Sequence, residues 1–257
     1  MTHKISPIRA VHSLDTCALF FRLDKKISKT HRDSIAALAM EYMKGKKSLT
    51  PDATPSSFAF SFSHDKEMEA DWLIHVQDHL LGFVCKQYTR WSDYYLVVES
   101  IMHDVFPIMP NHSIVKMGLG IHDIFDVQIS GDFPLTELFK QNSPYIAPAF
   151  MNAQVPPSKS HCTISSLFDA IHPWALYEKQ VVVGAFSSSK NNNLVFRVDN
   201  PQSFFANDNG LNLKSNDAFG CIKESADYLH DNNKEILSAI LVDTVLERIG
   251  LMEGGEK

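Results

Sequence analysis

The sequence has no hydrophobic run long enough to cross a membrane. No stretch approaches the roughly 18 to 20 consecutive apolar residues that a spanning helix needs. Its first residues, Met1 to Pro7, include no apolar segment of the kind found in a secretory signal peptide. We therefore expect a soluble, cytoplasmic protein that does not contact a membrane.

Cysteine is scarce, and its spacing matches no metal site. Cys17, Cys85, Cys162 and Cys221 are widely separated, with no Cys-x-x-Cys or zinc-type pattern. The sequence also lacks a Gly-x-Ser-x-Gly motif, a P-loop and a dinucleotide fingerprint. Serine and histidine are abundant, so a Ser/His/Asp triad stays open, but no residue is marked as a nucleophile. We predict no cofactor and assign no catalytic residue.

Basic residues are fewer than acidic residues. Lysine and arginine total 24 against 30 acidic residues, which gives a formal charge of −6 and a pI near 6.0. This balance argues against nucleic acid as a partner, because nucleic-acid-binding domains usually carry a basic excess. The hydrophobic share of 44% is that of an ordinary globular protein.

The longest regular pattern is an alternation over residues 114–130. Its odd positions are apolar except for Asp123, and most of its even positions are small or polar. Period two predicts a strand with one buried face, which would run roughly 50 Å at about 3.3 Å per residue.

Further patterns predict an α+β fold with a mostly antiparallel sheet and helices packed on one face. The predicted order is β-α-β-β-β-α-β followed by β-β-β-α, with a loop at 49–57 and a long final helix over 217–249. Five prolines in 131–158 indicate a connecting arm between an N-terminal half, 1–130, and a C-terminal half, 159–257. One continuous domain is the alternative.

The final helix carries apolar residues at alternating steps of three and four, with Asn233 among them. A lone asparagine in such a seam can set the register of a coiled coil, which predicts a homodimer through this helix. The alternative is a helix packed on the chain's own sheet, with a kink near Asn232-Asn233.

The central strand supplies the candidate binding residues. Asp123 falls on the apolar face, where an unpaired carboxylate is costly. It needs a buried partner such as Arg22, Lys116 or a histidine, or a bulge that turns it outward. Two glycines on the other face leave a trough for the final helix or for a ligand. The predicted site is Arg22, Lys116, Gly118, Gly120, His122 and Asp123.

Histidine–aspartate pairs suggest a second kind of site. His103-Asp104 and His230-Asp231 fall on predicted helices, and paired-metal phosphohydrolases bind metal through imidazoles and carboxylates. The alternative is that these histidines are structural and hydrogen-bonded.

Several motifs together resemble a known family. They are Pro7-Ile8, Phe21-Arg22-Leu23, Tyr88 to Trp91, Lys116 to Asp123 and Leu229-His230 through Val242-Asp243. In this order they resemble a sporadically distributed bacterial family of about this length that has no assigned function. Lys116 and Gly120 replace arginines of the family's central strand, and His122-Asp123 replaces an aliphatic residue and an asparagine. The resemblance implies that any anion site formed by those arginines is largely lost.

Three functions are compatible with these patterns. The first is a non-catalytic protein-interaction module, such as a regulatory or antitoxin-like subunit in a bacterial antiphage-defence or toxin–antitoxin system. The second is a metal-dependent nuclease or phosphohydrolase that uses the His/Asp pairs. The third is a small-molecule sensor that uses the glycine trough.

Overall fold

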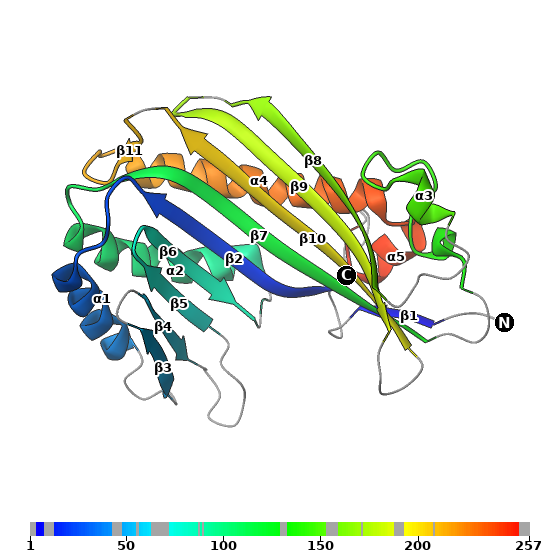
Figure 1. Cartoon of the computed structure of the whole chain (residues 1–257), viewed down its shortest axis with the longest axis horizontal. Helices are drawn as coiled ribbons and strands as arrows, with labels where there is room; N and C mark the ends of the chain where they lie inside the picture. The colour runs from blue at the N-terminus through cyan, green and yellow to red at the C-terminus, as the bar shows by residue number, and fades with distance from the viewer. Residues whose placement is uncertain are drawn as a thin grey trace.

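The structure is a computed structural model. It describes residues 4–7, 13–42, 48–54, 57–62, 72–86, 88, 90–128, 133–152, 159–170, 172–187, 193–207 and 209–251. The predicted α+β class is confirmed: an antiparallel sheet is backed by helices, one of them long and near the C-terminus (Figure 1). No helix in these ranges is long and apolar enough to span a membrane.

All strands in the described ranges belong to one sheet. They are β1 (Lys4–Pro7), β2 (Leu14–Leu23), β3 (Ser48–Thr54), β4 (Ser57–Phe62), β5 (Trp72–Gln77), β6 (Leu80–Cys85), β7 (Ser113–Gln128), β8 (Lys159–Asp169), β9 (Trp174–Ser187), β10 (Asn193–Ala206) and β11 (Leu211–Asn212). Their order is β3-β4-β5-β6-β2-β7-β10-β9-β8, and β1 and β11 pair with the two ends of β7. Because β7 pairs with β2 on one side and β10 on the other, the two predicted halves share this sheet.

The helices lie on one face of the sheet, as predicted. They are α1 (Lys29–Tyr42), α2 (Trp91–Val105), α3 (Pro148–Met151), α4 (Ala218–Ile240) and α5 (Asp243–Arg248), with short 3₁₀ turns η1 (Phe106–Ile108) and η2 (Leu135–Glu137). Figure 1 shows α2 and α4 behind the strands. The odd-numbered side chains of β7 face them, and Met117, Leu119 and Ile121 are completely buried. From Lys116 onward the even-numbered side chains lie on the opposite, open face, whereas Ile114, before the register shift, is buried in the core.

Polar side chains interrupt the buried face between two hydrophobic clusters. One cluster includes Ile121 of β7 and Leu229 of α4, and the other begins at Phe125 and Ile236. Between them lie inward-facing polar residues from three strands and from α4, which we call the polar belt. The polar belt is Asp123, Lys179, Asn200, Gln202 and Asn233.

The polar belt fixes the position of α4 on the sheet. Asn200 Nδ2 donates to Asn233 Oδ1 at 2.8 Å, and Gln202 Nε2 donates to the carbonyl oxygen of Leu229 at 3.0 Å. Asn233 therefore pairs within its own chain. Because the apolar seam of α4 is buried on the sheet, a homodimer through this helix would have to use a different helix face.

The final helix is shorter than predicted. It ends at Ile240, and Leu241 is extended and forms an isolated bridge with Phe139. Backbone bonds from Lys140 N to the Ile240 oxygen and from Val242 N to the Leu138 oxygen hold this break, and α5 follows it. The predicted single helix over 217–249 was wrong at this point. Contacts with the 133–152 segment make the break, and no Gly or Pro in the helix sequence marks it.

The predicted loop at 49–57 was also wrong, because β3 occupies most of it. Pro51 lies where the β3–β4 register shifts, between Leu49 and Asp52. Proline is tolerated there because β3 is an edge strand, and a residue in an irregular register loses no ladder bond.

Phe20 of the neighbouring strand β2 fills the glycine trough at Gly118 but not at Gly120. A Cβ on Gly118 would lie 2.2 Å from Phe20 Cζ and 2.7 Å from the Gln202 carbonyl oxygen, whereas one on Gly120 would meet nothing closer than 4.0 Å. The prediction that α4 packs into the trough was wrong, because the glycines alternate with the residues that face the helices.

This contrast predicts unequal effects of two matched substitutions. Gly118→Ala should lower the free energy of unfolding by about 1 to 3 kcal/mol, because the added methyl group meets a ring and a backbone oxygen. Gly120→Ala should change it by less than about 0.5 kcal/mol. Equilibrium urea unfolding measures both, and equal effects would contradict the close packing at Gly118.

Candidate functional site

The structure brings five of the six predicted binding residues onto the open face. Arg22 pairs with Lys116, and His122 follows along β7 beyond the two glycines. Asp123 points to the opposite, helix-covered face and is only 2% exposed. The six residues therefore do not form a single site.

The charged groups of the open face bind one another. His122 Nδ1 lies 2.6 Å from Asp199 Oδ1, and Arg197 contacts both Asp199 and His122. Burial alone would raise the pKa of Asp199, but hydrogen bonds from His122 and Arg197 lower it below its ordinary value. Lys116 Nζ lies 4.5 Å from the centre of the Phe205 ring. These contacts account for His122 and Lys116 as cross-strand pairs.

No cation in the described part of the chain forms an ion pair with Asp123. Ser13 Oγ donates to Asp123 Oδ1 at 2.6 Å, and Oδ2 is buried without a partner. The predicted pairing with Arg22 or Lys116 was wrong, because those side chains lie on the other face. The predicted outward turn was wrong too: the irregularity lies in β2, between Leu14 and Thr16. Burial raises the pKa of Asp123 to about 6.

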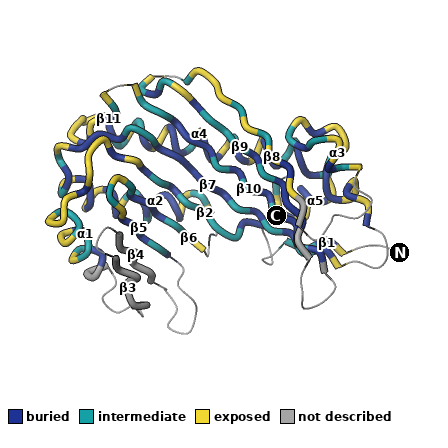
Figure 2. Tube along the Cα trace, in the orientation of Figure 1, coloured by how far each residue is buried: buried dark blue, intermediate teal, exposed yellow. Residues whose placement is uncertain are grey.

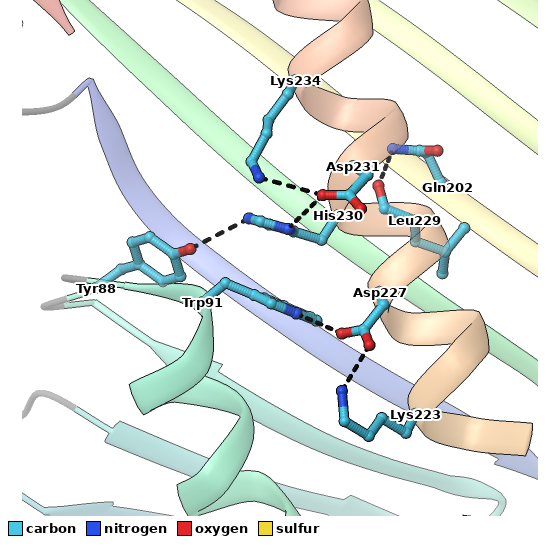
Figure 3. A network of polar contacts seen from close by, with 9 residues as sticks. All are labelled: Tyr88, Trp91, Gln202, Lys223, Asp227, Leu229, His230, Asp231 and Lys234. Atoms are coloured by element: carbon cyan, nitrogen blue, oxygen red, sulfur yellow. Dashed lines mark hydrogen bonds and ion pairs between the residues drawn. The ribbon is translucent and has the colours of Figure 1, made fainter. Parts of the chain in front are cut away.

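The His230-Asp231 pair lies in a polar network between α2 and α4 (Figure 3). His230 stacks on Trp91, with ring centres 4.4 Å apart and planes 7° from parallel. Its Nε2 is 3.4 Å from Tyr88 Oη, and its Nδ1 is 3.3 Å from Asp231 Oδ1. Burial lowers the pKa of His230 to about 4, so the ring is neutral at neutral pH.

The His103-Asp104 pair lies elsewhere. His103 stacks on Phe219 with ring centres 4.1 Å apart. Phe219 and His230 are eleven residues apart on α4, or roughly 16 Å at 1.5 Å per residue. In the described part of the chain no group of three or more His, Cys, Asp or Glu side chains could hold a metal ion. The two histidines thus pack as rings between helices.

A cleft of about 500 Å³ lies between α4 and the hairpin formed by β8 and β9. Its aromatic lining is Phe168, Trp174, Tyr177, Phe204 and Tyr228. Its polar lining includes Asp169, His172, Lys179, Glu224, Ser225 and Asn232. The cleft opens beside β8, an edge strand that is largely exposed (Figure 2).

The rings of the cleft form a continuous wall. The Phe168 ring centre is 5.9 Å from that of Tyr177, Tyr177 is 5.2 Å from Phe204, and Phe204 is 5.7 Å from Trp174. Tyr228 of α4 approaches this wall at 5.6 Å from both Tyr177 and Phe204. Trp174, Tyr177 and Phe204 are buried in this wall, whereas Phe168 and Tyr228 are exposed, so a flat apolar molecule would stack on those two rings.

Hydrogen bonds to α4 hold the wall in place. Trp174 Nε1 donates to Ser225 Oγ at 2.7 Å. The Tyr177 hydroxyl contacts Gln202 of the polar belt and lies 3.0 Å from Asn232 Oδ1. Because both rings are tied to the helix, the cleft is formed without any ligand.

Lys179 is the lysine in the lining of the cleft. It faces inward from β9, and its Nζ donates to Tyr145 Oη at 2.9 Å and lies 5.2 Å from the Phe168 ring centre. No carboxylate within the described ranges forms an ion pair with it. Asp169 and Glu224 are exposed at the rim of the cleft. The cleft therefore combines an inner cation with outer carboxylates.

The sequence patterns missed this cleft, although two signals point to it. Lys179 interrupts the apolar series Tyr177, Val181 and Val183 on the inward face of β9, just as Asp123 interrupts β7. Tyr228 is a large aromatic residue on α4 that lies outside the apolar seam. Neither signal says that the two residues line the same cleft, because β9 and α4 are distant in the sequence.

The raised pKa of Asp123 predicts a pH-dependent stability. Between pH 3.8 and about 6 the folded protein binds more protons than the unfolded chain, so the free energy of unfolding falls as pH rises through this window. In Asp123→Asn, which keeps an oxygen for Ser13, this decline should be absent. Relative to wild type, the variant should gain about 2 to 3 kcal/mol between acidic and neutral pH.

Urea unfolding at a series of pH values measures this difference. The lowered pKa of His230 acts in the opposite direction, since it reduces stability as pH falls from 6.5 to about 4. Because both proteins contain His230, its contribution cancels when their curves are subtracted. Parallel curves for wild type and variant would show that Asp123 does not titrate in this range.

Comparison with known proteins does not assign the chain to a family. No family model matches the chain, and no curated protein matches it. The resemblance to a sporadic bacterial family therefore depends on its motifs alone, and the functional argument depends on the cleft.

Proposed function

We propose that this chain is a non-catalytic binding protein that holds a small, flat molecule in the aromatic cleft. The observation that carries the proposal is the wall of rings that lines a preformed cavity of about 500 Å³. Small-molecule sites typically measure about 300 to 1,000 Å³ and combine apolar walls with a few fixed polar groups. The cleft has both properties.

Exposed aromatic rings support the proposal. Phe168 is 45% exposed and Tyr228 is 49% exposed, and both line the cleft. Large apolar side chains gathered at one exposed place usually mark a binding surface, because water contact there is unfavourable. A ligand between β8 and α4 would cover both rings. This moves the predicted small-molecule site from the glycine trough, which Phe20 fills at Gly118, to the other face of the sheet.

A protein partner is the second candidate, and the edge strand β8 favours it. Among the described residues β8 pairs only with β9, and Leu167 on β8 is 62% exposed. A long exposed edge strand is a template for strand addition by another chain. The predicted role in a defence or toxin–antitoxin system stays a prediction.

The cleft proposal predicts that removing one ring weakens binding. A neutral fluorescent arene, phenylnaphthylamine, should bind the wild-type protein and brighten as it leaves water. Tyr228→Ala should weaken this binding about tenfold, as expected from the loss of one stacking ring. Its stability should change little, because the side chain is half exposed.

Leu96→Ala is the matched control. Leu96 is 63% exposed on α2 and does not line the cleft, so its removal should leave the fluorescence titration unchanged. An absence of binding to the wild-type protein, or equal losses in both variants, would overturn the proposal.

The partner candidate predicts a different pattern. Leu167→Asp should release a protein that co-purifies in fixed stoichiometry from the native host, because charge on an edge strand discourages pairing. Leu96→Asp should retain it. The mass of the purified complex gives the number of copies of each protein in it. A partner that survives Leu167→Asp does not bind through β8.

A further inference from the structure

We infer that the ligand of the cleft is a planar aromatic acid whose anionic group is bound by Lys179. This inference rests on the proposed function, and it adds the chemical class of the ligand. It follows from the inward position of Lys179 on β9, from the rings beside it, and from the fact that no carboxylate in the described ranges forms an ion pair with it.

Lys179 occupies a position that would ordinarily be apolar. On β9 it faces the same side as Tyr177 and Val181, both of which are buried. A half-buried ammonium loses part of its hydration and normally gains a carboxylate in return. Here it has a hydroxyl, Tyr145 Oη, and two ring faces, those of Tyr145 and Phe168. The missing element is an anion.

The aromatic wall begins beside this ammonium. Phe168 lies under Lys179 Nζ and stacks on Tyr177, which adjoins Phe204. A ligand whose anionic group reaches Lys179 therefore lays its body on rings, and a planar aromatic body would use them best. A carboxylate there would form a charge-assisted hydrogen bond in a site partly shielded from water.

The same layout argues against an organic cation. Aromatic cages can bind ammonium groups, but in this cleft the chain's own ammonium already lies against Phe168 and Tyr145. A second cation would be repelled by it. Asp169 and Glu224 do not reverse this preference, because they are exposed at the rim, where solvent and salt screen their charge.

Competition between matched molecules tests the inference. Phenylnaphthylamine bound to the wild-type protein is displaced with naphthoate, with naphthamide, and with decanoate, an acid that has no ring. We expect naphthoate to compete about tenfold better than naphthamide, the difference made by one charge-assisted hydrogen bond. Decanoate should compete less well than naphthoate, because it cannot stack.

Variants at Lys179 assign the preference to one group. Lys179→Gln should bind naphthoate and naphthamide equally while it still binds the neutral probe, which shows that the cleft is intact. Lys179→Arg should restore the preference for the acid. Lys223→Gln, at an exposed lysine of α4 that pairs with Asp227 outside the cleft, should keep the wild-type preference.

The outcomes separate this inference from the proposed function. Equal competition by naphthoate and naphthamide in wild type, or a preference that survives Lys179→Gln, would overturn the anion inference and leave the cleft as a binding site. Decanoate competing as well as naphthoate would overturn the aromatic part. If the neutral probe fails to bind the wild-type protein, the proposed function fails and this inference fails with it.

Discussion

The rest of the structure depends on the burial of one face of β7 against α4. Strand alternation gives β7 an apolar face. The 23-residue helix α4 covers this face and the neighbouring faces of β10 and β9. Apolar packing alone would leave the helix free to slide along the sheet, because it is non-directional. The polar belt removes that freedom, since Asn200 and Gln202 each bond to one position on α4.

The polar belt also reaches the cleft. Hydrophobic clusters lie on either side of the polar belt, and its outermost member, Lys179, lines the cleft together with residues of α4. The rings beside it are held by bonds to Ser225 and Asn232 of the helix. The contacts that position α4 therefore also shape the cleft, so a ligand need not order the chain before it binds.

Two buried ionisable groups of this fold differ in how well their polar atoms are partnered. His230 stays neutral between Trp91 and Tyr88 and so fits an apolar interface at little cost. Asp123 keeps one unpartnered oxygen and a raised pKa, which is a cost to the folded state. The open face differs again, because His122, Arg197 and Asp199 satisfy one another across strands.

The sequence by itself determined the fold class, the central strand and the one-sided layering, because periods of two and of three to four residues are local and record which face is buried. It also marked Asp123 and Asn233 as exceptions to those periods. Only the tertiary structure decided their partners, the end of α4 at Ile240, and the meeting of Lys179 with the rings of Phe168 and Tyr145. Those features depend on the registers of β7, β9 and β10 and on the 133–152 segment, which bring together residues that no local pattern connects.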